Sequence, residues 1–239
     1  FNELSESLQR RFLEYELSVD IMTDATDREV RGMFERLNTY TLTLNRQEKL
    51  NAKYFGHFKR TIYEQAAIQT ENSTWEKLNL FSDQQIARMK EVEFSSDIFV
   101  ALLAGIQDIT YIPNSYKEYD DKFSREAHVS GKFRELMDFV VGQFYNTFKA
   151  TRFRNKAWAY SFIVALADAR YGIPDGFGQR KIISSSEIAH RMQSIHESFQ
   201  QNNSSKDFSK IKDAFSRGTS HIRERRTRHR QPRHARGFR

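Results

Sequence analysis

The sequence predicts a mainly α-helical fold, a helical bundle with one β-strand near its start. Most apolar residues recur at the three- and four-residue spacing of a helix, and only residues 15–21 clearly alternate as a strand does. Glycine and proline are scarce, at 10 and 3 of 239 residues, which disfavours a loop-rich all-β chain. Cysteine is absent from the sequence, which excludes disulfides, cysteine-ligated zinc, iron–sulfur clusters and thiol catalysis.

The first two elements are a short helix over residues 1–12 and a strand over residues 15–21. The strand carries four apolar side chains in alternation with polar ones: Tyr15, Leu17, Val19 and Ile21. A single strand cannot satisfy its own backbone donors and acceptors. Because the chain starts at Phe1 rather than Met, we expect the rest of its sheet to lie upstream in a larger protein. Pairing with a partner chain is the alternative.

From residue 26 onward the apolar period is predominantly helical. Asn45 and Glu48 form a capping-box pattern, which predicts a helix start. A long helix begins at Ser82 and is interrupted at Pro113. The main predicted helices cover residues 26–38, 45–69, 82–106, 133–148, 158–166 and 186–199, with a loop over 172–178, a hydrophilic linker over 200–206 and a last short helix before the C-terminal tail.

The net charge of +7 is concentrated at the end of the chain. Residues 217–239 contain nine arginines and one acid, a net of +8, so residues 1–216 carry −1. This segment has too few apolar residues for a packed face, so we expect a disordered tail or a frayed helix. It is a candidate nucleic-acid arm, because arginines near phosphates release counterions, and its candidate contacts are Arg223, Arg225, Arg226 and Arg228. A solvated tail and an artefact of the reading frame are the alternatives.

A short pattern after the strand carries a resemblance to a known family. Its main positions, in a fixed register across two helices and their loop, are Phe34, Arg36, Leu37, Asn38, Leu44, Glu48 and Asn51. The segment resembles the one that follows the nucleotide-site domain in the GmrSD restriction-endonuclease N-terminal-domain family (domain of unknown function 262). The preceding residues, RRFLEYELSVDIM, are similar to that family too. The resemblance is good over residues 1–70, has few motifs from there to about residue 215, and is absent in the tail.

The resemblance implies a role in the restriction of foreign or modified DNA in a prokaryotic cytoplasm. Members are similar to ParB/sulfiredoxin-like nucleotide-binding proteins, carry an upstream Asp-Gly-Gln-Gln-Arg box, use an NTP with Mg²⁺, and work with an HNH-type nuclease domain or subunit. This chain has no such box ahead of Phe34. Asp175–Arg180 is similar in letters but has one residue too many and lies after the motif, so we interpret it as a glycine-rich turn.

The predicted organisation follows from these observations. Residues 1–24 are a remnant of an upstream α/β domain, residues 25–216 form a helical domain, and residues 217–239 are the Arg-rich tail. We expect a scaffold that supports an NTP-dependent, DNA-directed activity located in other segments or a partner, so that this chain alone is not active. The alternative from a different functional class is a non-enzymatic module that binds nucleic acid through its tail or binds another protein. No membrane segment is predicted.

Each candidate residue also has a structural interpretation. Phe34, Leu37 and Leu44 suit a core, and Glu48 suits a capping box with Asn45. Arg36 and Asn38 either cap a helix end or lie at the mouth of the absent nucleotide site, where Arg36 would pair with phosphate.

The sequence predicts neither catalytic residues nor a metal site in this chain. Glu187 and His190 share a helix face, but His196 lies six residues beyond His190, roughly 120° away from it around the helix, so a polar face is the better interpretation. No catalytic-triad order, P-loop or zinc signature is present in the sequence.

Overall fold

The computed structural model divides the chain into two compact units, residues 1–44 and 45–239. The residues that it describes are 4–16, 19, 21, 23–26, 29, 33, 44–179, 183–200, 213–215 and 219–230. The domain boundary that the sequence analysis placed after residue 24 stays a prediction. Asn45 belongs to the second unit, where its Nδ2 donates to the carbonyl oxygen of Arg88 at 2.8 Å.

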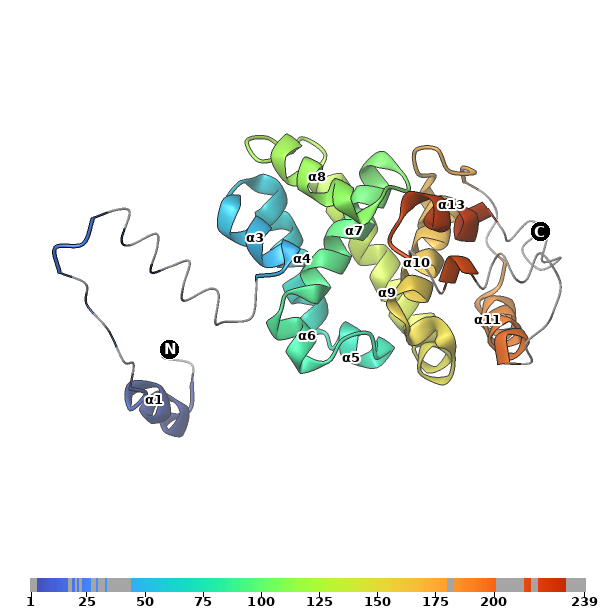
Figure 1. The fold of residues 1–239 in the computed structure, drawn as a ribbon. Coiled ribbons are helices and arrows are strands. Elements are labelled where there is room, and N and C mark those ends of the chain that lie inside the picture. Colours follow the sequence, from blue (N-terminus) through green and yellow to red (C-terminus); the bar gives the residue numbers. More distant parts are fainter. Residues whose placement is uncertain are drawn as a thin grey trace. The chain divides into compact units, whose positions relative to one another are not determined.

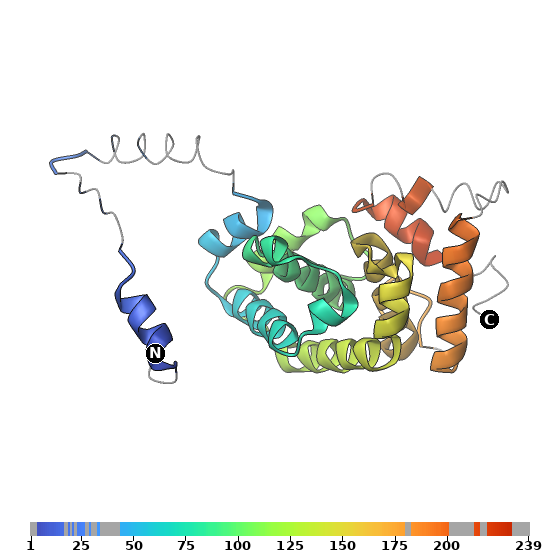
Figure 2. The same ribbon diagram turned by 90° about the horizontal axis from the view of Figure 1, so that it is seen from below.

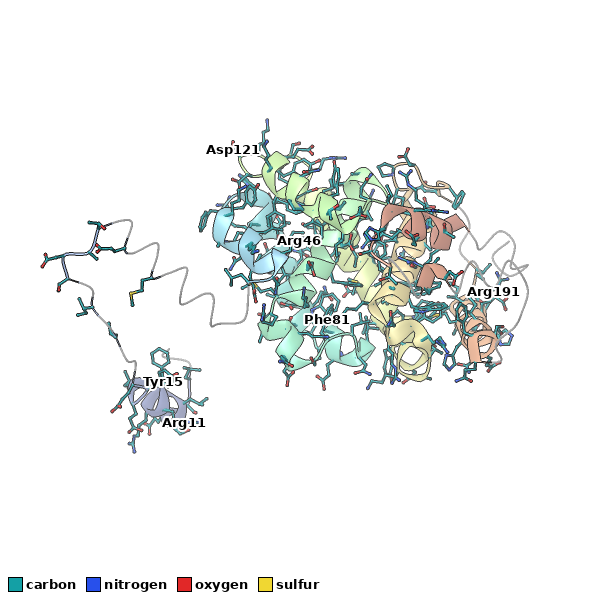
Figure 3. The ribbon with its side chains drawn as sticks, in the orientation of Figure 1. Arg11, Tyr15, Arg46, Phe81, Asp121 and Arg191 are labelled. Atoms are coloured by element: carbon teal, nitrogen blue, oxygen red, sulfur yellow. The ribbon has the colours of Figure 1, made fainter. Side chains whose placement is uncertain are left out.

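In the first unit, helix α1 (Glu6–Leu13) confirms the predicted N-terminal helix. The predicted strand is not seen among the described residues, which contain no strand; Tyr15, Glu16, Val19 and Ile21 have no regular secondary structure. A strand needs a neighbour for its backbone hydrogen bonds, and the described part of the chain offers none. The side chain of Tyr15, labelled in Figure 3, is 73% exposed.

The second unit, which we call the body, is a bundle of helices (Figure 1). A mainly α-helical fold is therefore confirmed for the described residues. The helical elements are α3 (Arg46–Lys53), α4 (His57–Glu71), α5 (Thr74–Leu78), α6 (Asp83–Ala87), α7 (Lys90–Ala104), η1 (Ile109–Tyr111), α8 (Ile112–Glu118), α9 (Glu126–Ala150), η2 (Arg152–Arg154), α10 (Lys156–Tyr171), α11 (Ser185–Gln200) and α13 (Ile222–Arg230).

Helix α7 lies at the centre of the body. It packs against α4, α9 and α10, and most of its residues are buried because they are apolar or small on every face. Phe58 of α4 and Phe99 of α7 meet edge to face in this core, with ring centroids 6.4 Å apart. Figure 2 shows the yellow-green helix α9 along one edge of the body, where it also packs against α5 and α11.

Two predicted long helices are each broken into shorter ones. The segment predicted as one helix over 45–69 is α3 and α4, because Asp120 holds the break: its Oδ1 accepts from the Gly56 N–H at 2.7 Å and its carbonyl from the His57 N–H at 2.9 Å. A Cβ at Gly56 would lie 1.9 Å from that carbonyl oxygen, so only glycine fits there. The helix predicted from Ser82 is broken at Met89, whose φ is 56°.

Pro113 begins a helix instead of interrupting one. Helix α7 already ends at Ala104, before Gly105, and α8 starts at Ile112 with Pro113 in its first turn. Proline is tolerated there because the first backbone N–H groups of a helix have no partner within it. None of the helices in the described part of the chain is long and apolar enough to cross a membrane.

Candidate functional site

The segment that carries the family resemblance is only partly described. Phe34, Arg36, Leu37 and Asn38 lie outside the described residues. Leu44, which we expected in the core, is 43% exposed, since it precedes the first helix of the body.

The predicted capping box at Asn45 is confirmed. The Asn45 side chain accepts from the Gln47 and Glu48 N–H groups, and the Glu48 carboxylate accepts from the Asn45 N–H at 2.7 Å.

Glu48 also ties this helix start to the rest of the body. The Arg88 guanidinium donates to both oxygens of its carboxylate, one of them at 3.0 Å. Burial raises the pKa of Glu48, but hydrogen bonds from the Asn45 N–H and from Arg88 outweigh it, and the net effect is a lowered pKa. Asn51 contributes a backbone contact between α3 and α4: its carbonyl oxygen accepts a hydrogen bond from the Lys59 ammonium at 2.7 Å. These positions of the motif therefore have structural roles.

The strongest concentration of buried charge lies around α13, within the segment predicted to be a disordered tail or a frayed helix. Residues 222–230 form a helix, and Arg225 and Arg228 are each only 5% exposed. Arg223 is exposed and the side chain of Arg226 is 39% exposed. The four candidate nucleic-acid contacts are thus divided between two faces of one helix, and two of them are turned into the protein. The reason is that residues three and four apart share a helix face.

Arg225 forms a bidentate ion pair with Asp97 of α7. Its Nη1 and Nη2 donate to the two carboxylate oxygens at 2.7 and 2.6 Å, and Nη1 also donates to the carbonyl of Gln107 at 3.0 Å. The guanidinium lies 4.2 Å from the centre of the Tyr160 ring. Although burial lowers the pKa of Arg225, Asp97 raises it further, so the arginine stays charged.

Arg228 is buried against neutral groups. Its Nε donates to the Ser161 hydroxyl at 2.8 Å, and its Nη1 and Nη2 donate to the backbone carbonyls of Ala214 and Thr219. Burial, followed by repulsion from Arg225, lowers the pKa of Arg228 to about 10.

His229 connects α13 to Asp168 of α10 and to the glycine-rich loop. Its Nε2 donates to the fully buried Asp168 carboxylate at 3.0 Å, and its ring stacks on Phe177. The same carboxylate accepts from the Phe177 and Gly178 N–H groups at 2.9 and 3.2 Å. A Cβ at Gly176 would lie 2.2 Å from it. The amides that could have cradled a phosphate are therefore directed at Asp168, and the described part of Asp175–Arg180 is a turn, as predicted.

We call Asp97, Asp168, Arg225, Arg228 and His229 the α13 polar cluster. Each carboxylate in it already accepts several hydrogen bonds, so the arrangement holds α13 and the 172–178 loop in place. The described residues contain no group of three histidine or acidic side chains placed to bind a metal ion. On α11, Glu187 accepts from Arg191 at 2.6 Å, and the His196 ring faces Gln200.

Asp108 stabilises the turn at residues 219–221 that leads into α13. It accepts from the Thr110 N–H and hydroxyl at 2.9 and 2.7 Å, and its other oxygen lies 3.0 Å from Nδ1 of His221. Burial raises the pKa of Asp108, but these hydrogen bonds outweigh it and lower the pKa to about 2. The folded-state pKa lies below the unfolded value, so this stabilisation is present above about pH 4 and is lost as the pH falls toward 2.

Asp108→Asn is expected to lower the free energy of unfolding by about 1 kcal/mol at neutral pH, after allowance for solvent screening. The difference from the unsubstituted protein should shrink by more than half between about pH 5 and pH 2, because Asp108 itself becomes protonated. Urea unfolding at several pH values measures it. A difference that stays constant over this range would contradict the role assigned to the Asp108 carboxylate.

A sequence signal for the α13 polar cluster exists. Arg225, Arg228 and His229 lie at i, i+3 and i+4, the spacing of one helix face. Asp97 and Asp168 are acids within strongly apolar helices, and an acid in such a place needs a buried partner. Counting the charge of the tail as a whole does not reveal which arginines turn inward.

Comparison of the chain with protein-family models, with curated proteins and with solved structures gives no match.

Proposed function

We propose that this chain is the helical part of a restriction or anti-phage defence protein related to the GmrSD N-terminal-domain family. In this proposal it supports an NTP-dependent, DNA-directed activity that other segments or a partner perform, with DNA and an HNH-type nuclease domain or subunit as partners. The NTP and Mg²⁺ are bound outside the described residues, and Arg36 and Asn38 lie at the edge of that site. The sequence pattern from Phe34 to Asn51 supports the family assignment.

The observation that carries the proposal is the exposed apolar surface before the body. Between residues 4 and 21, the exposed large apolar side chains are Leu4, Leu8, Phe12, Leu13, Tyr15, Val19 and Ile21. From residue 45 to 230, the described exposed ones are Phe55 and Tyr145. Apolar side chains gathered in this way mark a surface that another protein segment covers. A sheet of an α/β domain, to which residues 15–21 add a strand, fits the alternation of these side chains.

The test compares the protein encoded by the complete reading frame with this chain. In the complete protein, amide hydrogens of residues 15–21 are expected to exchange slowly, and NTP hydrolysis is expected. Arg36→Ala should reduce hydrolysis at least about tenfold with an unchanged melting temperature, since it removes a charge-assisted contact to phosphate. Arg60→Ala, at an exposed position of α4, is the matched control and should change neither. A complete protein that hydrolyses no NTP would refute the proposal.

The exposed face of α13 supports a second candidate, a nucleic-acid-binding module. Arg223 is exposed, and Arg226, whose side chain is 39% exposed, lies 3.8 Å from the exposed Asp175 carboxylate, so both guanidinium groups can be reached from solvent by phosphates. Deleting the tail would also remove Arg225 and Arg228 from the core, so the better test is the double variant Arg223→Gln/Arg226→Gln. DNA binding that weakens in this variant, with a shallower salt dependence and an unchanged melting temperature, would support the module. Binding equal to that of the unsubstituted protein would exclude this face.

A further inference from the structure

A small cavity beside the α13 polar cluster is the feature that carries a new assignment. It lies between α7, α10, α13 and the turn at Thr219 and Ser220, and its volume is about 150 Å³. Pockets for nucleotide-sized ligands usually hold roughly 300–1,000 Å³, so this one suits an ion. We propose that the cavity binds a phosphate-type oxyanion, either free phosphate or the phosphate group of a larger molecule. The inference is independent of the proposed function.

The charges around the cavity do not balance. Four cations and two carboxylates line it: Lys90, Lys156, Arg225, Arg228, Glu93 and Asp97. Lys90 pairs with Glu93 at 3.0 Å, and Arg225 pairs with Asp97 at 2.6 Å. The two pairs use both lining carboxylates, so the described lining has two more cations than carboxylates; Glu224 and Asp108, which also act on the arginines, do not line the cavity.

The two remaining cations are bonded to neutral groups among the described residues. Lys156 donates to the side-chain amide oxygen of Gln85 at 2.8 Å. Arg228 donates to a hydroxyl and two backbone carbonyls, which engage three of the five N–H donors that a guanidinium has. Two donors of Arg228 are left for a ligand, and a guanidinium matches phosphate oxygens in geometry.

Both cations are held at a cost that an anion would offset. Burial lowers the pKa of the partly buried Lys156 and repulsion from Lys90 lowers it further, while attraction to Glu93 offsets part of this. The pKa of Arg228 is lowered by burial and then by Arg225, and Glu224 and Asp97 offset part of this. A charge taken out of water without full compensation is unfavourable, and an oxyanion in the cavity adds to the compensation.

A hydroxyl group adds a further donor at the cavity wall. Tyr160 lines the cavity, and its buried oxygen makes no hydrogen bond of standard geometry among the described residues, although the Arg225 guanidinium lies close to it. Burial raises the pKa of Tyr160, so the phenol keeps its proton and can donate it to an oxyanion. The lining therefore offers an ammonium, a guanidinium and a hydroxyl, which are the groups that commonly bind phosphate.

The test is a calorimetric titration of the full chain with inorganic phosphate at constant ionic strength, with chloride as the background salt. We expect saturable binding, which Lys156→Gln weakens about tenfold because it removes one charge-assisted hydrogen bond. Lys149→Gln, an exposed lysine near the end of α9, is the matched control and should leave the affinity unchanged. No saturable binding, or an equal effect of the two variants, would overturn the proposal.

Thermal melting gives a second, independent readout. Phosphate should raise the melting temperature of the protein, and this rise should be smaller for Lys156→Gln than for Lys149→Gln. Without phosphate, Lys156→Gln should change the melting temperature little, because the relief of repulsion from Lys90 offsets the lost hydrogen bond to Gln85 and the lost attraction to Glu93. The source of the phosphate group is then identified by competition. Displacement of phosphate by a DNA duplex without terminal phosphates assigns the cavity to backbone phosphates, and failure of the duplex to displace it assigns the cavity to free phosphate.

Discussion

Asp97→Asn is expected to lower the free energy of unfolding by about 3–5 kcal/mol. The substitution preserves the shape of the side chain but leaves the Arg225 guanidinium charged, buried and without a counter-ion. Urea unfolding followed by circular dichroism measures the loss. The matched control is Glu135→Gln at the partly exposed pair with Arg170, where the loss should stay within about 1 kcal/mol.

A double variant separates the charge from the packing in this prediction. Asp97→Leu combined with Arg225→Met removes both charges and leaves apolar groups of similar size, so it should recover most of the lost stability. Burial raises the pKa of Asp97, and the Arg225 charge offsets only part of this rise. The size of the loss therefore also shows whether Asp97 is ionised in the folded protein. A loss of less than about 1 kcal/mol for Asp97→Asn would contradict an ionised pair.

Phe58→Ala is expected to lower the free energy of unfolding by about 3–5 kcal/mol. Phe58 is fully buried, and its ring lies 5.0–6.4 Å, between centroids, from four other aromatic rings: Phe99, Tyr116, Tyr119 and Phe123. Removing it leaves a cavity that helices on three sides cannot close.

Phe55→Ala is the matched control for this substitution. Phe55 is three residues away but 72% exposed, and its one described ring contact is with Lys59 at 4.4 Å. Its loss should stay within about 1 kcal/mol. Equal losses for the two variants would show that the core around Phe58 is not packed as described.

The helices with a strong local signal could be predicted from the sequence. The apolar repeat at three- and four-residue spacing located α9, α10 and α11, and the Asn45–Glu48 pair located the start of α3. The break between α3 and α4 could not be predicted, because the residue that holds it, Asp120, is more than sixty positions away in the sequence. The alternating pattern over 15–21 is also a local signal, but these residues form a β-strand only where another strand pairs with them.

The candidate site shows the same division between local and long-range information. Charge counting identified the arginines of α13 but treated them as one exposed set. Which of them turn inward depends on Asp97 and Ser161, which belong to α7 and α10 and approach α13 only in the folded chain. The turn at Asp175 was predicted correctly from its glycines, whereas its anchor, Asp168, became visible only in the structure.

Hydrogen exchange measured by mass spectrometry tests the central claim most directly, namely that α13 is a buried part of the body and not a free basic arm. We expect amides of residues 222–230 to exchange at least about 100-fold more slowly than in an unstructured peptide. Helix α1 is the internal reference: it has no buried residue and is short, so it should exchange quickly. Rapid exchange of residues 222–230, at the rate of α1, would contradict the account.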